Sequence, residues 1–226
     1  MKRDFSISAL ISEGCNLMNK NWLMFIALIL IEGVASSILT SRILPTEALM
    51  NMKTDNIEDV MRIYSSVWTS PMIYLSQIVS ILFAAVMAKM AFDAIDGKKV
   101  SFEAFKMPVA TYLNYLGTSI VVGFLAGIGM VFCLLPGIFI GVRLSLATNY
   151  VIDRGYGVAD AIKASWHDTN GNFWGILGAV IVITLFICVG FLACCVGLYY
   201  TQPAGTIALC VLARLFAQTS DYMPKA

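Results

Sequence analysis

Long apolar stretches, separated by short polar ones, dominate the pattern of this chain. Two stretches, 107–142 and 169–213, contain no Asp, Glu, Lys or Arg. A membrane helix needs about 20 residues, so each stretch is too long for a single crossing. Pro136-Gly137 and Pro203 lie within them, and turns are expected there. Each stretch therefore predicts a pair of antiparallel membrane helices.

Two further apolar stretches lie upstream. The first, 22–40, is apolar except for Glu32, and the second, 72–90, is apolar except for Gln77 and Lys89. The pattern predicts an all-α, polytopic membrane protein, with residues 1–226 forming a single transmembrane domain and six transmembrane helices arranged in three hairpins. The expected spans are about 22–40, 72–90, 112–134, 136–152, 173–198 and 203–219.

The distribution of Lys and Arg predicts the orientation. Basic residues gather in the N-terminal segment, in the second-to-third and fourth-to-fifth connections and in the tail, which six spans place on one side. The loops around Pro136 and Gln202 carry no charge, and the long loop 41–70 is net negative. Because basic loops stay in the cytoplasm, both termini are expected there, in a bacterial inner membrane. The apolar run starts only at Trp22, so a cleaved signal peptide is not expected.

Three amphipathic segments precede the three hairpins on the predicted cytoplasmic side. They are Phe5–Met18, Val100–Val109 and Val158–Thr169, with apolar residues three or four apart. Such helices either lie in the membrane interface or pack against the ends of the bundle. The first and third units align through Asn-x-Asn-aromatic turns, which indicates an internal repeat. A further helix is expected at about 55–69, on the outer surface.

Polar residues within the spans form the first candidate site. Glu32, Gln77 and Arg143 are expected at similar depths, where ionisable groups usually pair. This intramembrane polar cluster is either a structural bond that fixes helix packing or a proton or ligand site.

A second set of residues concerns helix packing. Gly123 and Gly127 are four apart in the third span, and Gly137 and Gly141 are four apart in the fourth, after Pro136. Small residues at this spacing allow close approach of helices. They predict a tightly packed central hairpin, with a dimer interface as the alternative.

Composition and missing motifs exclude several classes of function. Hydrophobic residues make up 59% of the chain and charged residues 13%, with a net charge of +1, so neither a soluble enzyme nor a nucleic-acid binder is expected. The single histidine, His167, excludes a two-histidine zinc motif. No catalytic residues, metal or cofactor are predicted. The six cysteines are expected to be small apolar residues of the interior.

One part of the chain resembles a known family. The pattern runs from Leu135-Pro136-Gly137-Ile138 through Arg143, Ile152-Asp153 and Ala159–Lys163 to Ser165. It is similar to uncharacterised bacterial membrane proteins related to the membrane domain of some glycerophosphoryl diester phosphodiesterases. The resemblance implies a six-helix membrane protein. It carries no hydrolase activity over, because the chain lacks the residues of a hydrolase domain.

These observations predict an inner-membrane protein without catalytic apparatus, which binds membrane lipids or scaffolds a partner. The partner would be another membrane protein or a second copy of the chain. One alternative is a small transporter or channel subunit that uses Glu32, Gln77 and Arg143. The other is an enzyme acting on lipid head groups through Asp153, Arg154, His167 and Asp168 on the cytoplasmic side.

Overall fold

The computed structural model describes residues 5–41, 57, 61, 65, 69–132, 134–192, 196–220 and 222, and all regular elements within them are helical. The fold-class prediction of an all-α protein is therefore confirmed over this part of the chain. The helices are α1 (Ile7–Thr40), α4 (Pro71–Ile95), the 3-10 helix η1 (Phe102–Lys106), α5 (Val109–Phe132), α6 (Leu134–Leu144), α7 (Ala147–Arg154), α8 (Val158–Asp168), α9 (Phe173–Leu192) and α10 (Val196–Gln218).

Five segments of the described chain are long and apolar enough to cross a membrane. They are Ile7–Thr40, Pro71–Ile95, Val109–Val131, Leu135–Arg154 and Phe173–Phe191. Helix α10, which corresponds to the sixth predicted span, does not belong to this group. Its first half carries Thr201, Gln202 and Pro203, and Arg214 follows near its end. Six crossings thus remain a prediction.

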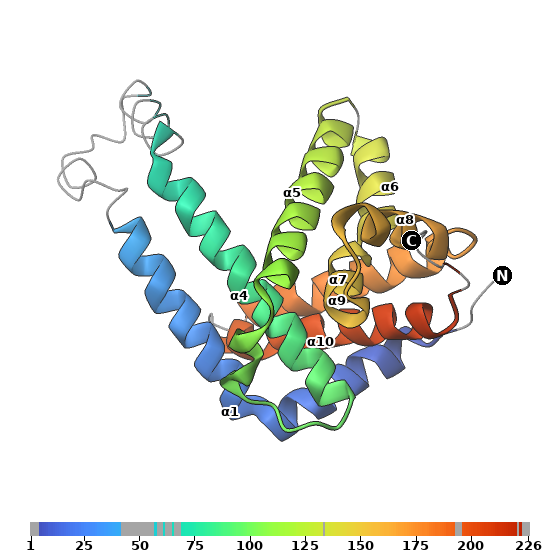
Figure 1. The fold of residues 1–226 in the computed structure, drawn as a ribbon, viewed down its shortest axis with the longest axis horizontal. Coiled ribbons are helices and arrows are strands. Elements are labelled where there is room, and N and C mark those ends of the chain that lie inside the picture. Colours follow the sequence, from blue (N-terminus) through green and yellow to red (C-terminus); the bar gives the residue numbers. More distant parts are fainter. Residues whose placement is uncertain are drawn as a thin grey trace.

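Helix α1 packs against α4, α5 against α6 and α9 against α10. In Figure 1 the α1/α4 and α5/α6 pairs diverge as two arms. Helix α10 runs across their base, where it contacts α1, α4, α7 and α9. Most of its apolar side chains are buried there, which makes α10 the centre of the core.

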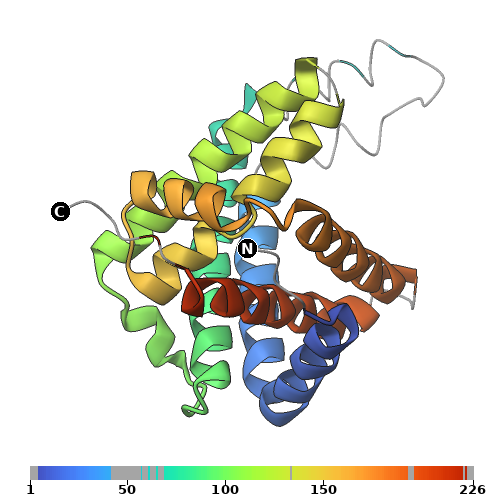
Figure 2. The ribbon, with the colours of Figure 1, turned by 90° about the vertical axis from the view of Figure 1, so that its right-hand side faces the viewer.

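A bend divides α1 into an N-terminal segment and a longer apolar segment. Asn21 has non-helical backbone angles, and its side-chain amide donates to the Leu17 carbonyl at 3.2 Å. The N-terminal segment lies against α10, as Figure 2 shows. A Cβ atom at Gly14 would lie 2.5 Å from the Ala204 carbonyl oxygen, so this contact requires glycine. The predicted amphipathic helix therefore exists, and it packs on the bundle.

The two other predicted amphipathic segments also contain helices. Residues 102–106 form η1, and 158–168 form α8. Helix α8 buries Ala161, Ala164 and Ser165 and contacts α5, α6 and α7. For α1 and α8, the structure thus favours packing against the bundle. The predicted outer helix at 55–69 lies outside the described residues, apart from Ile57, Met61, Ser65 and Thr69.

The fourth predicted span lies within the candidate span Leu135–Arg154, which consists of two consecutive helices. Helix α6 ends at Leu144 and α7 begins at Ala147, so the helical ladder is interrupted at residues 145–146. The Arg143 carbonyl, at the end of α6, accepts hydrogen bonds from the Ser165 hydroxyl at 2.7 Å and from Thr169 at 3.4 Å. These side chains satisfy a backbone acceptor near the interruption, as buried backbone groups require.

The central hairpin is tightly packed, but through a different pair of glycines from the one predicted. A Cβ atom at Gly129 would lie 2.8 Å from the Gly137 Cα, whereas Gly123, Gly127 and Gly141 have nothing within 4 Å of a Cβ. Successive helical residues are about 100° apart, so Gly123 and Gly127 face away from the side that carries Gly129. Gly137 is thus the one predicted packing glycine that the structure places in the contact, and Pro136 lies beside it near the start of α6.

Candidate functional site

Arg143 lies at the end of α6, beside the end of α8. Its guanidinium group donates to the Trp166 carbonyl and to Asn170 Oδ1, all at 3.4 Å, which is long for a hydrogen bond. The same group lies over two aromatic rings, 5.2 Å from the centroid of Phe139 and 5.3 Å from that of Trp166. Its Nε is buried without a hydrogen-bond partner.

The charge of Arg143 is not neutralised by a carboxylate of the described chain. The ion pairs formed between described residues involve other groups. Aromatic rings and a carbonyl dipole stabilise a cation only in part. The guanidinium group therefore retains the capacity to bind an anion.

A large apolar groove adjoins this arginine. It has a volume of about 780 Å³ and lies between α5, α6 and α9. Phe139, whose ring faces the Arg143 guanidinium, is part of the groove wall. Its ring centroid lies 5.1 Å from that of Phe173 in α9. All the other wall residues are apolar or glycine: Ala126, Met130, Leu135, Pro136, Gly137, Ile138, Gly141, Val142, Trp174, Leu177, Val180 and Ile181.

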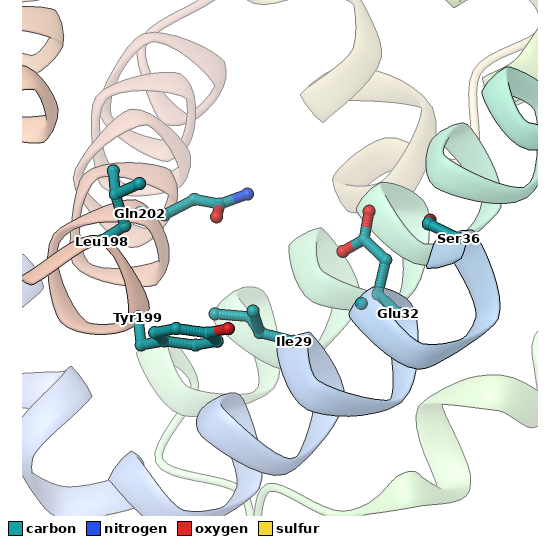
Figure 3. A pocket seen from close by; sticks show the side chains of 7 residues that line it. Ile29, Glu32, Ser36, Leu198, Tyr199 and Gln202 are labelled. Atoms are coloured by element: carbon teal, nitrogen blue, oxygen red, sulfur yellow. The ribbon is translucent and has the colours of Figure 1, made fainter. Parts of the chain in front are cut away.

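Glu32 lies in a separate, smaller cavity of about 290 Å³ between α1 and α10. Figure 3 shows its carboxylate projecting from α1 toward the Gln202 amide, which projects from α10. Ser36 and Tyr199 also line the cavity. The Glu32 carboxylate also accepts a hydrogen bond from the Ser80 side chain of α4.

The structure does not bring the three predicted polar residues together. Glu32 interacts with Ser80 and faces Gln202, Arg143 interacts with α8 and the following turn, and Gln77 is exposed on α4. None of the contacts within the described residues joins Glu32 to Arg143. The separation has a plain reason: α6, which carries Arg143, packs against α5, α8 and α9, whereas α1, which carries Glu32, packs against α4 and α10.

Sequence reasoning missed a buried ionic network at the predicted cytoplasmic side. Arg214 of α10 pairs with Asp96 and with Asp153, both at 2.6 Å, and the Asp153 side chain is only 6% exposed. Lys98 donates to Asp96 at 2.9 Å, and this bond, together with Arg214, holds the pKa of Asp96 below its usual value. The available signal was that Asp96 and Asp153 lie just beyond predicted span ends, and Arg214 near the end inside another span, all on the same predicted side.

Asp168, one of the residues considered for head-group chemistry, lies in a second polar network. Its buried carboxylate accepts hydrogen bonds from the Tyr150 hydroxyl at 2.8 Å and from the Ser220 hydroxyl at 2.6 Å. His167 Nδ1 lies 3.0 Å from the same carboxylate. The Ser220 hydroxyl thus points to Asp168 rather than to the imidazole that a nucleophile would need. The geometry ties the end of α8 to α7 and to the segment after α10.

The three cysteines in the described part of the chain, Cys15, Cys188 and Cys210, are free thiols. Cys133, Cys194 and Cys195 lie outside it. Over the residues that the structure describes, no group of three or more His, Cys, Asp or Glu side chains is arranged to hold a metal ion.

Comparison with known proteins gives distant relatives only. The chain is 29% identical over 115 residues to an uncharacterized protein of Mycobacterium bovis and to one of Mycobacterium tuberculosis. The match covers 51% of this chain and 35% of each relative, so the chain matches about a third of their length. No protein family matches the chain, and no solved structure does. The resemblance to the phosphodiesterase-associated membrane domain therefore stays a prediction.

Proposed function

We propose that this protein binds a phosphate-bearing lipid of a bacterial inner membrane. The apolar groove between α5, α6 and α9 holds an acyl chain, and Arg143 binds the phosphate of an anionic head group. The observation that carries this proposal is the position of Arg143, whose guanidinium group lies over a wall residue of the groove and lacks a carboxylate partner in the described chain.

The size and chemistry of the groove support a lipid ligand. Its volume lies within the range of about 300–1,000 Å³ that is typical of ligand sites. Its walls contain no ionisable side chain, which suits an acyl chain and no polar solute. Arginine binds phosphate oxygens through two parallel N–H bonds, and basic pockets between membrane helices recognise anionic head groups in this way.

The proposal includes six crossings with both termini in the cytoplasm, α10 being the sixth. The Lys and Arg residues of the N-terminal segment, of the second-to-third and fourth-to-fifth connections and of the tail support it.

Native mass spectrometry of the protein released from nanodiscs tests the proposal. The nanodiscs contain equal amounts of phosphatidylglycerol, which is anionic, and phosphatidylcholine, which is zwitterionic. The wild type is expected to retain phosphatidylglycerol. Arg143→Gln removes charge-assisted hydrogen bonds of about 1.5–3 kcal/mol, and therefore lowers retention roughly tenfold or more. Release of a bare protein, or equal retention by the variant, would overturn the proposal.

A pair of glycine substitutions tests the groove itself. Gly141 lies in the groove wall, and a Cβ atom there meets nothing within 4 Å, so Gly141→Leu fills the groove without a clash. Gly123 is equally open but lies outside the groove. Gly141→Leu is expected to lose the lipid, and Gly123→Leu is expected to keep it. Loss in both variants would assign the effect to general perturbation of the helices.

Transport is a second candidate function, and the interruption between α6 and α7 favours it. Discontinuous membrane helices typically form the binding sites of secondary transporters. Proton flux into proteoliposomes under an imposed membrane potential, followed with an internal pH dye, tests this alternative. Flux equal to that of empty liposomes would refute proton-coupled transport.

A further inference from the structure

The cavity around Glu32 contains a negative charge without a cationic partner in the described chain. Glu32 takes part in none of the ion pairs between described residues. Its hydrogen bond comes from the neutral Ser80 hydroxyl, and the cavity wall contains no Lys, Arg or His. A carboxylate at membrane depth is costly without a counter-charge.

Several acceptors converge on the same space. The Gln202 amide faces Glu32 across the cavity (Figure 3), and the Ser36 hydroxyl lies one helical turn beyond Glu32. The cavity thus combines a carboxylate with the neutral side-chain oxygens of Gln202 and Ser36.

We propose that this cavity binds an organic monovalent cation of the alkylammonium type. One carboxylate matches one positive charge, and the neutral oxygens match the N–H donors of an ammonium group. Ile29, Leu198 and the Tyr199 ring provide an apolar wall for an alkyl chain. A volume of about 290 Å³ is large for a bare metal ion, and a divalent ion would require more carboxylate ligands than the one present.

This site is separate from the groove beside Arg143. The two share no wall residue: the cavity lies between α1 and α10, and the groove between α5, α6 and α9. The proposal therefore does not depend on lipid binding, and variants of Arg143 are expected to leave it unchanged.

Titration calorimetry with n-butylammonium chloride tests the proposal, with n-butanol as the uncharged probe of similar shape. The purified full chain is used in a nonionic detergent at pH 7, where the amine is protonated. Saturable binding of butylammonium, without binding of butanol, is the expected result for the wild type. Equal heats from the two probes, or none from butylammonium, would overturn the proposal.

Two variants test the site, one by removing its charge and the other by filling the cavity. Glu32→Gln keeps the shape and removes the charge, so affinity is expected to fall roughly tenfold or more. Gly33→Leu fills the cavity, since a Cβ atom at Gly33 meets nothing within 4 Å, and it removes a helix-weakening glycine. It should abolish binding while the protein stays folded. The matched control Glu103→Gln, on exposed η1, should bind like the wild type. Undiminished binding in Glu32→Gln or Gly33→Leu would refute the assignment.

Discussion

Replacing Arg214 by methionine removes the cation that holds two carboxylates of the predicted cytoplasmic side. Asp153 and Asp96 each lie 2.6 Å from its guanidinium group, with side chains 6% and 27% exposed. Methionine preserves much of the apolar contact that the arginine stem makes, so the change is mainly one of charge. Helices α4, α7 and α10 meet at this point, and the network therefore joins three elements that are distant in the sequence.

The size of the loss in stability depends on which ion-pair partners each carboxylate keeps in the variant. Removing one member of a buried ion pair costs about 3–5 kcal/mol, because the remaining charge is left uncompensated. Among the described residues, Asp96 keeps Lys98 at 2.9 Å, and Asp153 keeps only Arg154 at 3.7 Å. Most of the loss therefore falls on Asp153, and we expect a decrease of about 3 kcal/mol in the free energy of unfolding.

Unfolding in mixed micelles with increasing dodecyl sulfate, followed by far-ultraviolet circular dichroism, measures this change. The control Lys106→Met removes an exposed cation that lies 3.5 Å from Glu103, and surface changes of this kind alter stability by only about 0.5 kcal/mol. The double variant Arg214→Met/Asp153→Asn should be more stable than Arg214→Met alone, since the uncompensated charge is gone. If Arg214→Met were no less stable than Lys106→Met, the ionic network would not contribute to the fold as argued.

Two further predictions concern packing and pH. Gly14→Ala should destabilise the protein by about 1–3 kcal/mol, because the new methyl group would lie 2.5 Å from the Ala204 carbonyl oxygen. Gly33→Ala, where a Cβ atom meets nothing within 4 Å, should stabilise it by about 0.5–1 kcal/mol. Thermal unfolding measures both variants, and equal changes in their unfolding temperatures would contradict the close contact at Gly14. The pKa of Asp96 is lowered in the folded protein, so its contribution to stability is complete above the ordinary aspartate pKa of about 3.9 and is lost as the pH falls through the folded value. Asp96→Asn should therefore be less stable than the wild type at pH 6, with a difference that shrinks below about pH 4; a pH-independent difference would refute the assignment.

Much of the fold follows from local pattern. Charge-free stretches predict the helices, but the turn expected at Pro203 is wrong, since Pro203 lies inside α10, which begins at Val196. The spacing of apolar residues predicts the N-terminal segment of α1, and the Asn-x-Asn-aromatic turn predicts its end, where Asn21 has non-helical backbone angles. The interruption of the fourth span has no comparable local signal. It depends on Ser165 and Thr169, which satisfy the Arg143 carbonyl from more than twenty residues away.

The candidate sites were only partly predictable for the same reason. The sequence identifies Glu32 and Arg143 as charged residues in apolar stretches. If both helices were straight and parallel, the two residues would lie at similar depths in the membrane, and the sequence therefore predicts that they pair. The packing of α6 against α8 brings Arg143 to Trp166 and Asn170, so the partners of each charge are set by tertiary structure. Among the glycines, spacing alone favours Gly123 and Gly127, while the contact uses Gly129 because it faces the neighbouring helix.

The packing of the N-terminal segment on α10 has a consequence for the order of events during synthesis. The Tyr200 hydroxyl donates to Asn19 Oδ1 at 3.0 Å, between residues 181 positions apart. At about 5–20 residues per second, a ribosome needs roughly 10–35 s to add the second partner after the first. During this interval the apolar face of the N-terminal segment has no α10 to cover it, and the membrane surface is the nearest apolar environment. We therefore expect the N-terminal segment to bind the membrane surface until α10 is synthesised and packs against it.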